Sequence, residues 1–314
     1  MKLIFMGTPD FAVYGLEALH KSAHTILAVV TVPDKPQGRG KKILPSPVKE
    51  KAIELGYNVL QPESLNSDEF YHQVEELDPE CIVVIAFKKI PERIFDLPAF
   101  GAINIHGSLL PKYRGAAPIN HAIMNGETET GVTSFYINEE IDAGTILLQK
   151  SCAIGPQENF GDIYYKLAHL GADLIVETLD QLDGDGIVFK VQDQTIVSKA
   201  PKISPETCLI EWEKPAENIH NMIRGLAPRP CAYSYLNGKK VKFYSSEYEH
   251  DSSETKANPG EVVYVSKKEI KIATGDGFLV PTSVQIQGKK QMNIVDFLNG
   301  NTIEVGSLLT NRSE

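Results

Sequence analysis

Apolar and polar residues alternate along the first half of the chain in a pattern that predicts strands and helices in turn. Short, continuous apolar runs such as Leu3–Met6 and Cys81–Phe87 are typical of strands buried on both faces of a sheet. Between such runs, apolar residues recur at helical spacing, as in Phe11–His20 and Gly161–Leu182. The other predicted elements of this part are Ile26–Val32, Val48–Leu55, Asn58–Gln61, Asp68–Leu77, Gly101–His106, Ile119–Met124, Val132–Ile137 and Thr145–Leu148. This α/β alternation predicts a doubly wound, mainly parallel sheet with helices on both faces.

The pattern changes after about residue 188. Residues 189–206 are polar and lack long periodic segments, which is typical of a linker. From residue 207 the chain has a short helical stretch, Ala216–Gly225, and then short strands separated by turn signals. These signals are Asn237-Gly238, Asn258-Pro259-Gly260, Gly275-Asp276-Gly277 and Gly288. We therefore expect three parts: an α/β domain over 1–188, a linker over 189–206, and a C-terminal β-barrel of the oligonucleotide-binding type over 207–314.

Length and composition agree with two domains of an ordinary globular protein. The chain has 314 residues, of which 42% are apolar, and no apolar run approaches the length that spans a bilayer. The four cysteines lie far apart and form no Cys-x-x-Cys pair, which argues against a zinc knuckle and a disulfide framework. We expect a cytoplasmic protein that does not associate with membranes.

A net charge of −10 argues at first against a nucleic-acid partner. However, Lys35, Arg39, Lys41 and Lys42 stand within eight residues that contain no acidic residue. Because distant charges are screened in salt, a local basic loop can still contact phosphates. The alternative is a set of ordinary solvated cations on a surface loop.

The segment Ala102–Pro111 contains the most informative candidate chemistry. Successive side chains on a strand point to opposite faces, so Asn104 and His106 share one face while the isoleucines between them share the other. Gly107 and Pro111 end this strand, and ligands of open α/β sheets bind at the carboxyl ends of the strands. The alternative is a core histidine with its hydrogen bonds satisfied, beside a hydrogen-bonded asparagine.

Asp142 lies in the short connection between two apolar strands, within Glu139–Gly144. A carboxylate there could reach His106 and orient its imidazole. Taken alone, the residue is better explained as an ordinary turn aspartate.

Several familiar cofactor and nucleophile motifs do not occur in the chain. Residues 7–12 occupy the place of a dinucleotide fingerprint but lack its glycine spacing, which argues against a nicotinamide cofactor. Thr8 instead predicts an N-cap for the first helix, with Pro9 as its first residue. There is no Walker-type loop, His-Glu-x-x-His pair or Gly-x-Ser-x-Gly elbow.

Residues 104–119, which read NIHGSLLPKYRGAAPI, are followed by Thr130-Gly131-Val132-Thr133 and by Asp142-Ala143-Gly144. In these motifs, and over nearly its whole length, the chain resembles the methionyl-tRNA formyltransferase family. The resemblance implies a Rossmann-like formyltransferase domain followed by the β-barrel. It also implies transfer of the formyl group of 10-formyltetrahydrofolate to the α-amino group of methionylated initiator tRNA, in translation initiation. We further expect that no metal takes part in the reaction and that the protein is a monomer.

The same resemblance implies roles for particular residues. Asn104, His106 and Asp142 would be catalytic, and the basic Lys35–Pro47 loop would contact tRNA. The predicted folate contacts are Ser108, Leu109, Leu110, Pro111 and Phe87. Phe87 is followed by Lys88, where a glycine is expected in the family, so the wall of the folate pocket differs there.

Three other functions share some of these features. The first is a 10-formyltetrahydrofolate-dependent transferase that acts on a small-molecule amine such as an amino sugar, which would need neither the basic loop nor the barrel. The second is a hydrolase that passes the formyl group to water from the same site. The third is a non-catalytic RNA-binding protein built on the barrel, which leaves Asn104, His106 and Asp142 unexplained.

Overall fold

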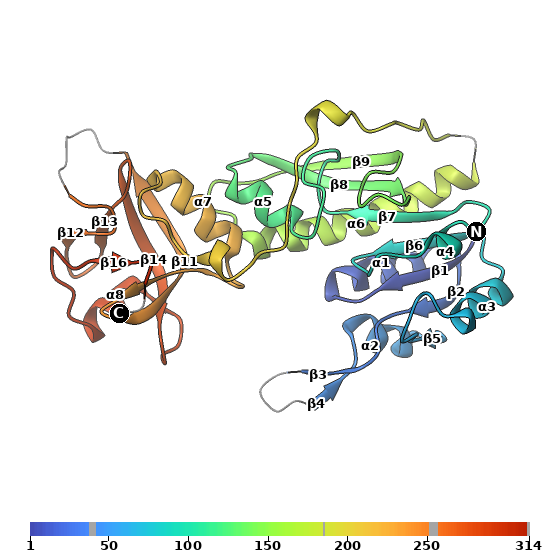
Figure 1. Cartoon of the computed structure of the whole chain (residues 1–314), viewed down its shortest axis with the longest axis horizontal. Coiled ribbons are helices and arrows are strands. Elements are labelled where there is room, and N and C mark those ends of the chain that lie inside the picture. The colour runs from blue at the N-terminus through green and yellow to red at the C-terminus, as the bar shows by residue number, and fades with distance from the viewer. Residues whose placement is uncertain (38–41, 185, 251–256, 313–314) are drawn as a thin grey trace. The chain divides into compact units, whose positions relative to one another are not determined.

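The computed structural model describes residues 1–37, 42–184, 186–250 and 257–312, and divides the chain into two compact units (Figure 1). Unit 1 comprises Met1–Pro118, Glu129–Cys152 and Tyr164–Ala200. Unit 2 comprises Ile119–Thr128, Ala153–Ile163 and Pro201–Glu314. The segment predicted as a linker, 189–206, is thus shared between them, with its first part in unit 1.

Unit 1 is built on a seven-stranded sheet of order β5-β2-β1-β6-β7-β8-β9 (Figure 1). The first five of these strands run parallel to their neighbours, and β8 is antiparallel to β7. The predicted mainly parallel sheet is therefore confirmed. The strands are β1 (Lys2–Gly7), β2 (Thr25–Val30), β5 (Val59–Leu60), β6 (Cys81–Ile85), β7 (Ala102–His106), β8 (Glu129–Tyr136) and β9 (Ile146–Ala153). A separate hairpin joins β3 (Lys35–Gln37) to β4 (Lys42–Leu44).

Helices cover both faces of this sheet, as the double winding requires. On one face, Gly15 of α1 approaches Ile85, and Gly171 of α6 approaches Ile105, so these helices pack closely on β6 and β7. On the other face, the buried cluster that contains Ile4 and Val84 also takes in side chains of α3 and α4. The helices of this part of the chain are α1 (Asp10–His20), α2 (Pro47–Glu54), α3 (Asp68–Leu77), α4 (Glu92–Phe95), α5 (Pro118–Met124) and α6 (Phe160–Asp183). Of these, α5 belongs to unit 2 apart from its first residue. No helix in the described ranges combines the length and the apolar character needed to cross a membrane.

The start of α1 differs from the expectation. The N-cap position belongs to Pro9, whose extended backbone (ψ 174°) delays the first helical residue to Asp10, and no side chain caps the helix. The Asp10 carboxylate accepts a hydrogen bond from the Phe11 amide (3.1 Å), which satisfies one amide of the first turn. The prediction that Thr8 caps this helix was wrong.

Unit 2 contains an antiparallel sheet of order β12-β13-β14-β11-β10-β16, with β15 paired to β14. Its strands are β10 (Ala232–Leu236), β11 (Lys239–Glu249), β12 (Val262–Val265), β13 (Ile270–Ala273), β14 (Phe278–Ile286), β15 (Met292–Asn293) and β16 (Leu309–Thr310). The sheet curls until its two edges meet: Leu309 N–H donates to Gly260 O (2.8 Å) and Val262 N–H donates to Ser307 O (2.8 Å). This curled antiparallel sheet confirms the predicted barrel-like C-terminal fold.

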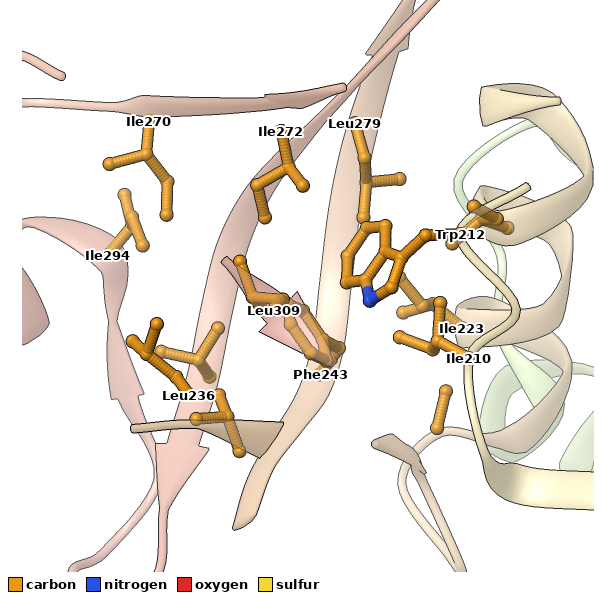
Figure 2. Packing of buried hydrophobic residues seen from close by; sticks show 14 of the residues in the cluster. Ile210, Trp212, Ile223, Leu236, Phe243, Ile270, Ile272, Leu279, Ile294 and Leu309 are labelled. Carbon is orange, nitrogen blue, oxygen red and sulfur yellow. The ribbon is translucent and has the colours of Figure 1, made fainter. Parts of the chain in front are cut away.

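The core of unit 2 is packed around Trp212 and Phe243, whose rings meet edge to face with centroids 5.9 Å apart (Figure 2). The indole N–H, which needs a partner when buried, donates to Ser234 Oγ at 3.0 Å. Ile223 of α7 (Ala216–Leu226) joins the same cluster. The remaining helices are α8 (Ile294–Gly300) and two 3-10 turns, η1 (Gln194–Ile196) and η2 (Glu206–Cys208).

We expect the stability of unit 2 to depend on pH through His220 of α7. Burial is the main cause that lowers the pKa of His220, and its ring nitrogens bond Ser246 Oγ (3.1 Å) and Pro156 O (3.2 Å). A histidine with a lowered pKa in the folded state stabilises the fold when neutral, and that stability is lost as pH falls below about 6.5. Urea unfolding at several pH values should show a steeper loss towards acid in the wild type than in His220→Gln. Parallel curves for the two proteins would contradict this prediction.

Candidate active site

Strand β7 places Asn104 and His106 on the sheet face opposite α6, because Ile105 between them packs against Gly171 of that helix. In the sheet register, Asn104 lies beside Val84 of β6, and His106 lies beside Thr133 of β8. The half-buried carboxamide of Asn104 has no hydrogen-bond partner among the residues that the structure describes. It is therefore available to a bound molecule.

The imidazole of His106 is held by two contacts of different kinds. Its Nε2 lies 2.9 Å from the carbonyl oxygen of Tyr113, which can only accept, so Nε2 carries a proton. Its Nδ1 lies 3.7 Å from Asp142 Oδ2, and the two side chains are only 7% and 13% exposed. Nδ1 is thus the nitrogen that can gain or release a proton, and it faces the carboxylate.

Asp142 is presented by a tight turn between β8 and β9. Its backbone is left-handed (φ +54°), and its Oδ2 accepts a hydrogen bond from the Gly115 amide at 2.8 Å. Two residues later the chain passes so close to β8 that a Cβ on Gly144 would lie 1.6 Å from Tyr136 O. Only glycine fits at this position, which explains why an Asp-Ala-Gly sequence forms the turn.

The residues predicted to contact folate are mostly packed inside the loop that follows β7. Ser108 is buried and its hydroxyl donates to Lys112 O at 2.7 Å, while Leu110 and Pro111 are buried as well. Leu109 is partly exposed, and Phe87 is a partly buried side chain packed against the cluster of β1, β6 and α3. The exposed edges of Leu109 and Phe87, together with backbone groups of the loop, are thus what this part of the chain presents to a ligand.

The predicted basic loop is only partly described. Lys35 is exposed at the start of β3, and the backbone of Lys42 in β4 pairs with that of Gln37. Arg39 and Lys41 lie outside the described residues.

The base of the β3–β4 hairpin is fastened to the body of unit 1. Asp34 accepts from Lys49 Nζ (2.7 Å) and from Gln61 Nε2 (2.8 Å). The chain just before β3 is therefore held against α2 and against the residue that follows β5.

Sequence reasoning did not identify three groups that hold the His106–Asp142 pair: the Tyr113 carbonyl, the Gly115 amide and the side chain of Gln192. Gln192 is 3% exposed and bonds the carbonyls of Asp142 (2.9 Å) and Gly144 (2.8 Å). Gly115 was a possible signal, since its left-handed backbone (φ +127°) and close approach to Ala200 O exclude any side chain. Within the described ranges, no group of three or more His, Cys, Asp or Glu side chains is placed to hold a metal ion.

Comparison with known proteins identifies the family. The formyl transferase family model matches residues 1–179, and the formyl transferase C-terminal domain model matches residues 202–302. The chain is 45% identical to the methionyl-tRNA formyltransferase of Moorella thermoacetica over 310 residues, covering 98% of this chain and 99% of the relative. It is 43% identical to that of Porphyromonas gingivalis over 309 residues, covering 96% and 95%.

A solved N-formyltransferase from Helicobacter canadensis, in complex with folinic acid and dTDP-3-aminofucose, shares the fold. The two structures superpose with a TM-score of 0.67 at 21% identity, covering 90% of this chain and 98% of that one. At 21% identity, this structural likeness shows a shared fold. The sequence similarity to the methionyl-tRNA formyltransferases, at 45% and 43% identity over nearly the full chain, is much closer. On that similarity, the chain belongs to the methionyl-tRNA formyltransferase family.

Proposed function

We propose that Asn104, His106 and Asp142 are the catalytic residues with which this chain carries out the reaction of its family. That reaction transfers the formyl group of 10-formyltetrahydrofolate to the α-amino group of methionyl-tRNA. The proposal rests on one observation. Asn104 and His106 lie on the same face of β7 near its carboxyl end, and the turn between β8 and β9 brings Asp142 to His106. There the imidazole and the carboxylate face each other at 3.7 Å.

Asn104 is suited to stabilise charge on the donor. When bound, the folate supplies an amide-like formyl carbon, whose oxygen becomes negative as the amine attacks. The Asn104 amide has no competing partner in the described chain and can donate to that oxygen. One such donor, fixed in place before the reaction, contributes about 10²–10³ in rate.

His106 and Asp142 are suited to move protons. The attacking α-amine must be neutral, and Asp142 can take its proton either directly or through water. Oδ2 is occupied by the Gly115 amide, and Oδ1 accepts no hydrogen bond from any described residue, so Oδ1 is free to act. His106 can deliver a proton from Nδ1 to the departing nitrogen while its Nε2–H stays on Tyr113 O.

Further parts of the proposal concern binding and cellular context. We propose that the loop after β7, from Ser108 to Pro111, and Phe87 line the folate site. We further propose that the basic residues Lys35, Arg39, Lys41 and Lys42 contact the tRNA. We also propose that the protein is a monomer and that it works in the cytoplasm, where charged initiator tRNA is used.

The direct test is transfer of labelled formyl from 10-formyltetrahydrofolate to methionyl-tRNA, with uncharged tRNA as the control. Label should appear on the charged tRNA alone. Assays with a free amino sugar and with no acceptor separate this activity from a small-amine transferase and from a hydrolase. The methionyl-tRNA formyltransferase relatives, 40–45% identical over nearly the whole chain, make the sugar amine the less supported acceptor. Efficient formylation of the sugar, or release of formate without acceptor, would contradict the proposal.

Arg39→Ala should weaken the use of tRNA more than the use of folate. Loss of one phosphate contact lowers the slope of log affinity against log salt concentration by about one. The difference in tRNA affinity from the wild type should therefore shrink as salt rises. The measurement is KM for each substrate at several salt concentrations. Lys51→Ala is the matched control, because this cation is already paired with Glu17 (3.0 Å) and Glu54 (2.8 Å). Equal effects of Arg39→Ala on the two substrates would contradict a role of the loop in tRNA binding.

A further inference from the structure

The side chain of Gln192 uses its whole hydrogen-bonding capacity beside the candidate site. Its Nε2 donates to Asp142 O and Gly144 O, at 2.9 and 2.8 Å. Its Oε1 accepts from Arg114 Nε and Nη2, at 2.9 and 2.7 Å. A buried carboxamide with two donations and two acceptances has no capacity left for a ligand. It therefore acts between two segments of the protein.

The two segments joined by Gln192 are those that hold the imidazole and the carboxylate. Arg114 lies between Tyr113, whose carbonyl accepts from His106 Nε2, and Gly115, whose amide donates to Asp142 Oδ2. On the other side, Gln192 bonds the backbone of Asp142 itself and of Gly144. One side chain thus links the support of His106 to the turn that carries Asp142.

The chain around Gln192 continues this attachment. Residues 190–200, here called the strap, begin with Lys190 paired to Ile146 by two backbone hydrogen bonds (2.9 and 3.0 Å). They end at Ser198 and Ala200, which bond both backbone groups of Arg114: Arg114 N–H donates to Ser198 O (2.9 Å), and Ala200 N–H donates to Arg114 O (2.7 Å). Ser198 Oγ also accepts from the Tyr113 amide at 2.9 Å. The strap is therefore fixed at both ends against the segments that support the pair.

We propose that Gln192 is a positioning residue for the formyl transfer, which sets the place of the Asp142 carboxylate relative to His106 Nδ1. The inference rests on the proposed roles of His106 and Asp142. The backbone of Asp142 is left-handed (φ +54°), a conformation that costs a non-glycine residue energy and persists only when its surroundings hold it. The two donations of Gln192 to this turn supply that hold, and the bonds to Arg114 fix the direction of the carboxamide.

Gln192→Met, which keeps the length of the side chain and removes all four hydrogen bonds, should lower kcat about 10- to 100-fold, the effect of misplacing a reacting group by about 1 Å. KM for 10-formyltetrahydrofolate should stay near its wild-type value. Gln192→Glu keeps the acceptor for Arg114 but cannot donate to the two carbonyls, so its kcat should be as low as that of Gln192→Met. A wild-type kcat in Gln192→Glu would overturn the proposal, since it would assign the effect to Arg114 alone.

The decisive measurement is a double-mutant cycle with Asp142→Asn. If Gln192 acts through the Asp142 carboxylate, Gln192→Met should change kcat by no more than about twofold in the Asp142→Asn background. The same fold-loss in both backgrounds would show a merely structural role and overturn the proposal. Thr178→Val is the matched control, because it removes buried hydrogen bonds of the same unit to Ser134 Oγ (2.8 Å) and Leu174 O (2.7 Å). Its kcat should be normal at temperatures where all the variants are folded. Near-normal turnover of Asp142→Asn by itself would instead reject the proposed function.

Discussion

Asp142→Asn should lower kcat about 10²–10⁴-fold, the usual contribution of a general acid–base group. The asparagine has the same shape and can still accept from the Gly115 amide, which lies 2.8 Å from Oδ2, so the turn should keep its conformation. It cannot take a proton from the attacking amine, and it brings no negative charge to His106 Nδ1. The measurement is the steady-state rate of formyl transfer with saturating 10-formyltetrahydrofolate and methionyl-tRNA.

The control for this variant is a measurement of its thermal stability. Its thermal unfolding midpoint should stay close to that of the wild type, because the side chain is at the rim of the buried region, 13% exposed, and keeps its hydrogen bond. His106→Ala should show a comparable loss of rate, because the variant has no imidazole to deliver a proton to the departing nitrogen. Near-normal turnover in either variant would rule out the assigned role.

The second large effect is expected at Asn104. Asn104→Ala should lower kcat about 10²–10³-fold, the typical effect of removing one donor to an oxygen that gains charge during reaction. Because the carboxamide makes no hydrogen bond to the described protein, little stability should be lost.

Asn104→Asp is the informative partner of this variant. The carboxylate has the size of the amide but offers no N–H, so it should be at least as slow as alanine. Activity retained in the aspartate variant would show that size, and not hydrogen-bond donation, is what this position supplies.

The local parts of the fold could be predicted because they depend on side-chain periodicity. The apolar runs of β1 and β6 and the helical spacing of α3 and α6 identified those elements to within one or two residues. The strict alternation along β7 placed Asn104 and His106 on one face, where the structure has them. Asn237-Gly238 likewise predicted the hairpin between β10 and β11, and both residues have the positive φ (48° and 69°) that this turn requires.

The supports of the candidate site were beyond sequence reasoning for a physical reason. Two of them, the Tyr113 carbonyl and the Gly115 amide, are backbone groups, which every residue has, so no residue type marks them. Gln192 lies in a polar segment without periodicity. From the sequence alone such a segment is interpreted as a linker, because the hydrogen-bond partners of Gln192 cannot be read from it. Its partners are about 50 and 78 residues away along the chain, a separation that only the tertiary fold brings together.

The closure of the curled sheet in unit 2 bears on how the protein behaves at high concentration. A free sheet edge offers a row of unsatisfied N–H and C=O groups, on which a strand of another molecule can align and start aggregation. Here the amides of Leu309 and Val262 and the carbonyls of Gly260 and Ser307 are used up within the same chain. Because these groups already bond one another, a strand of another molecule cannot pair with them where the edges of the sheet meet.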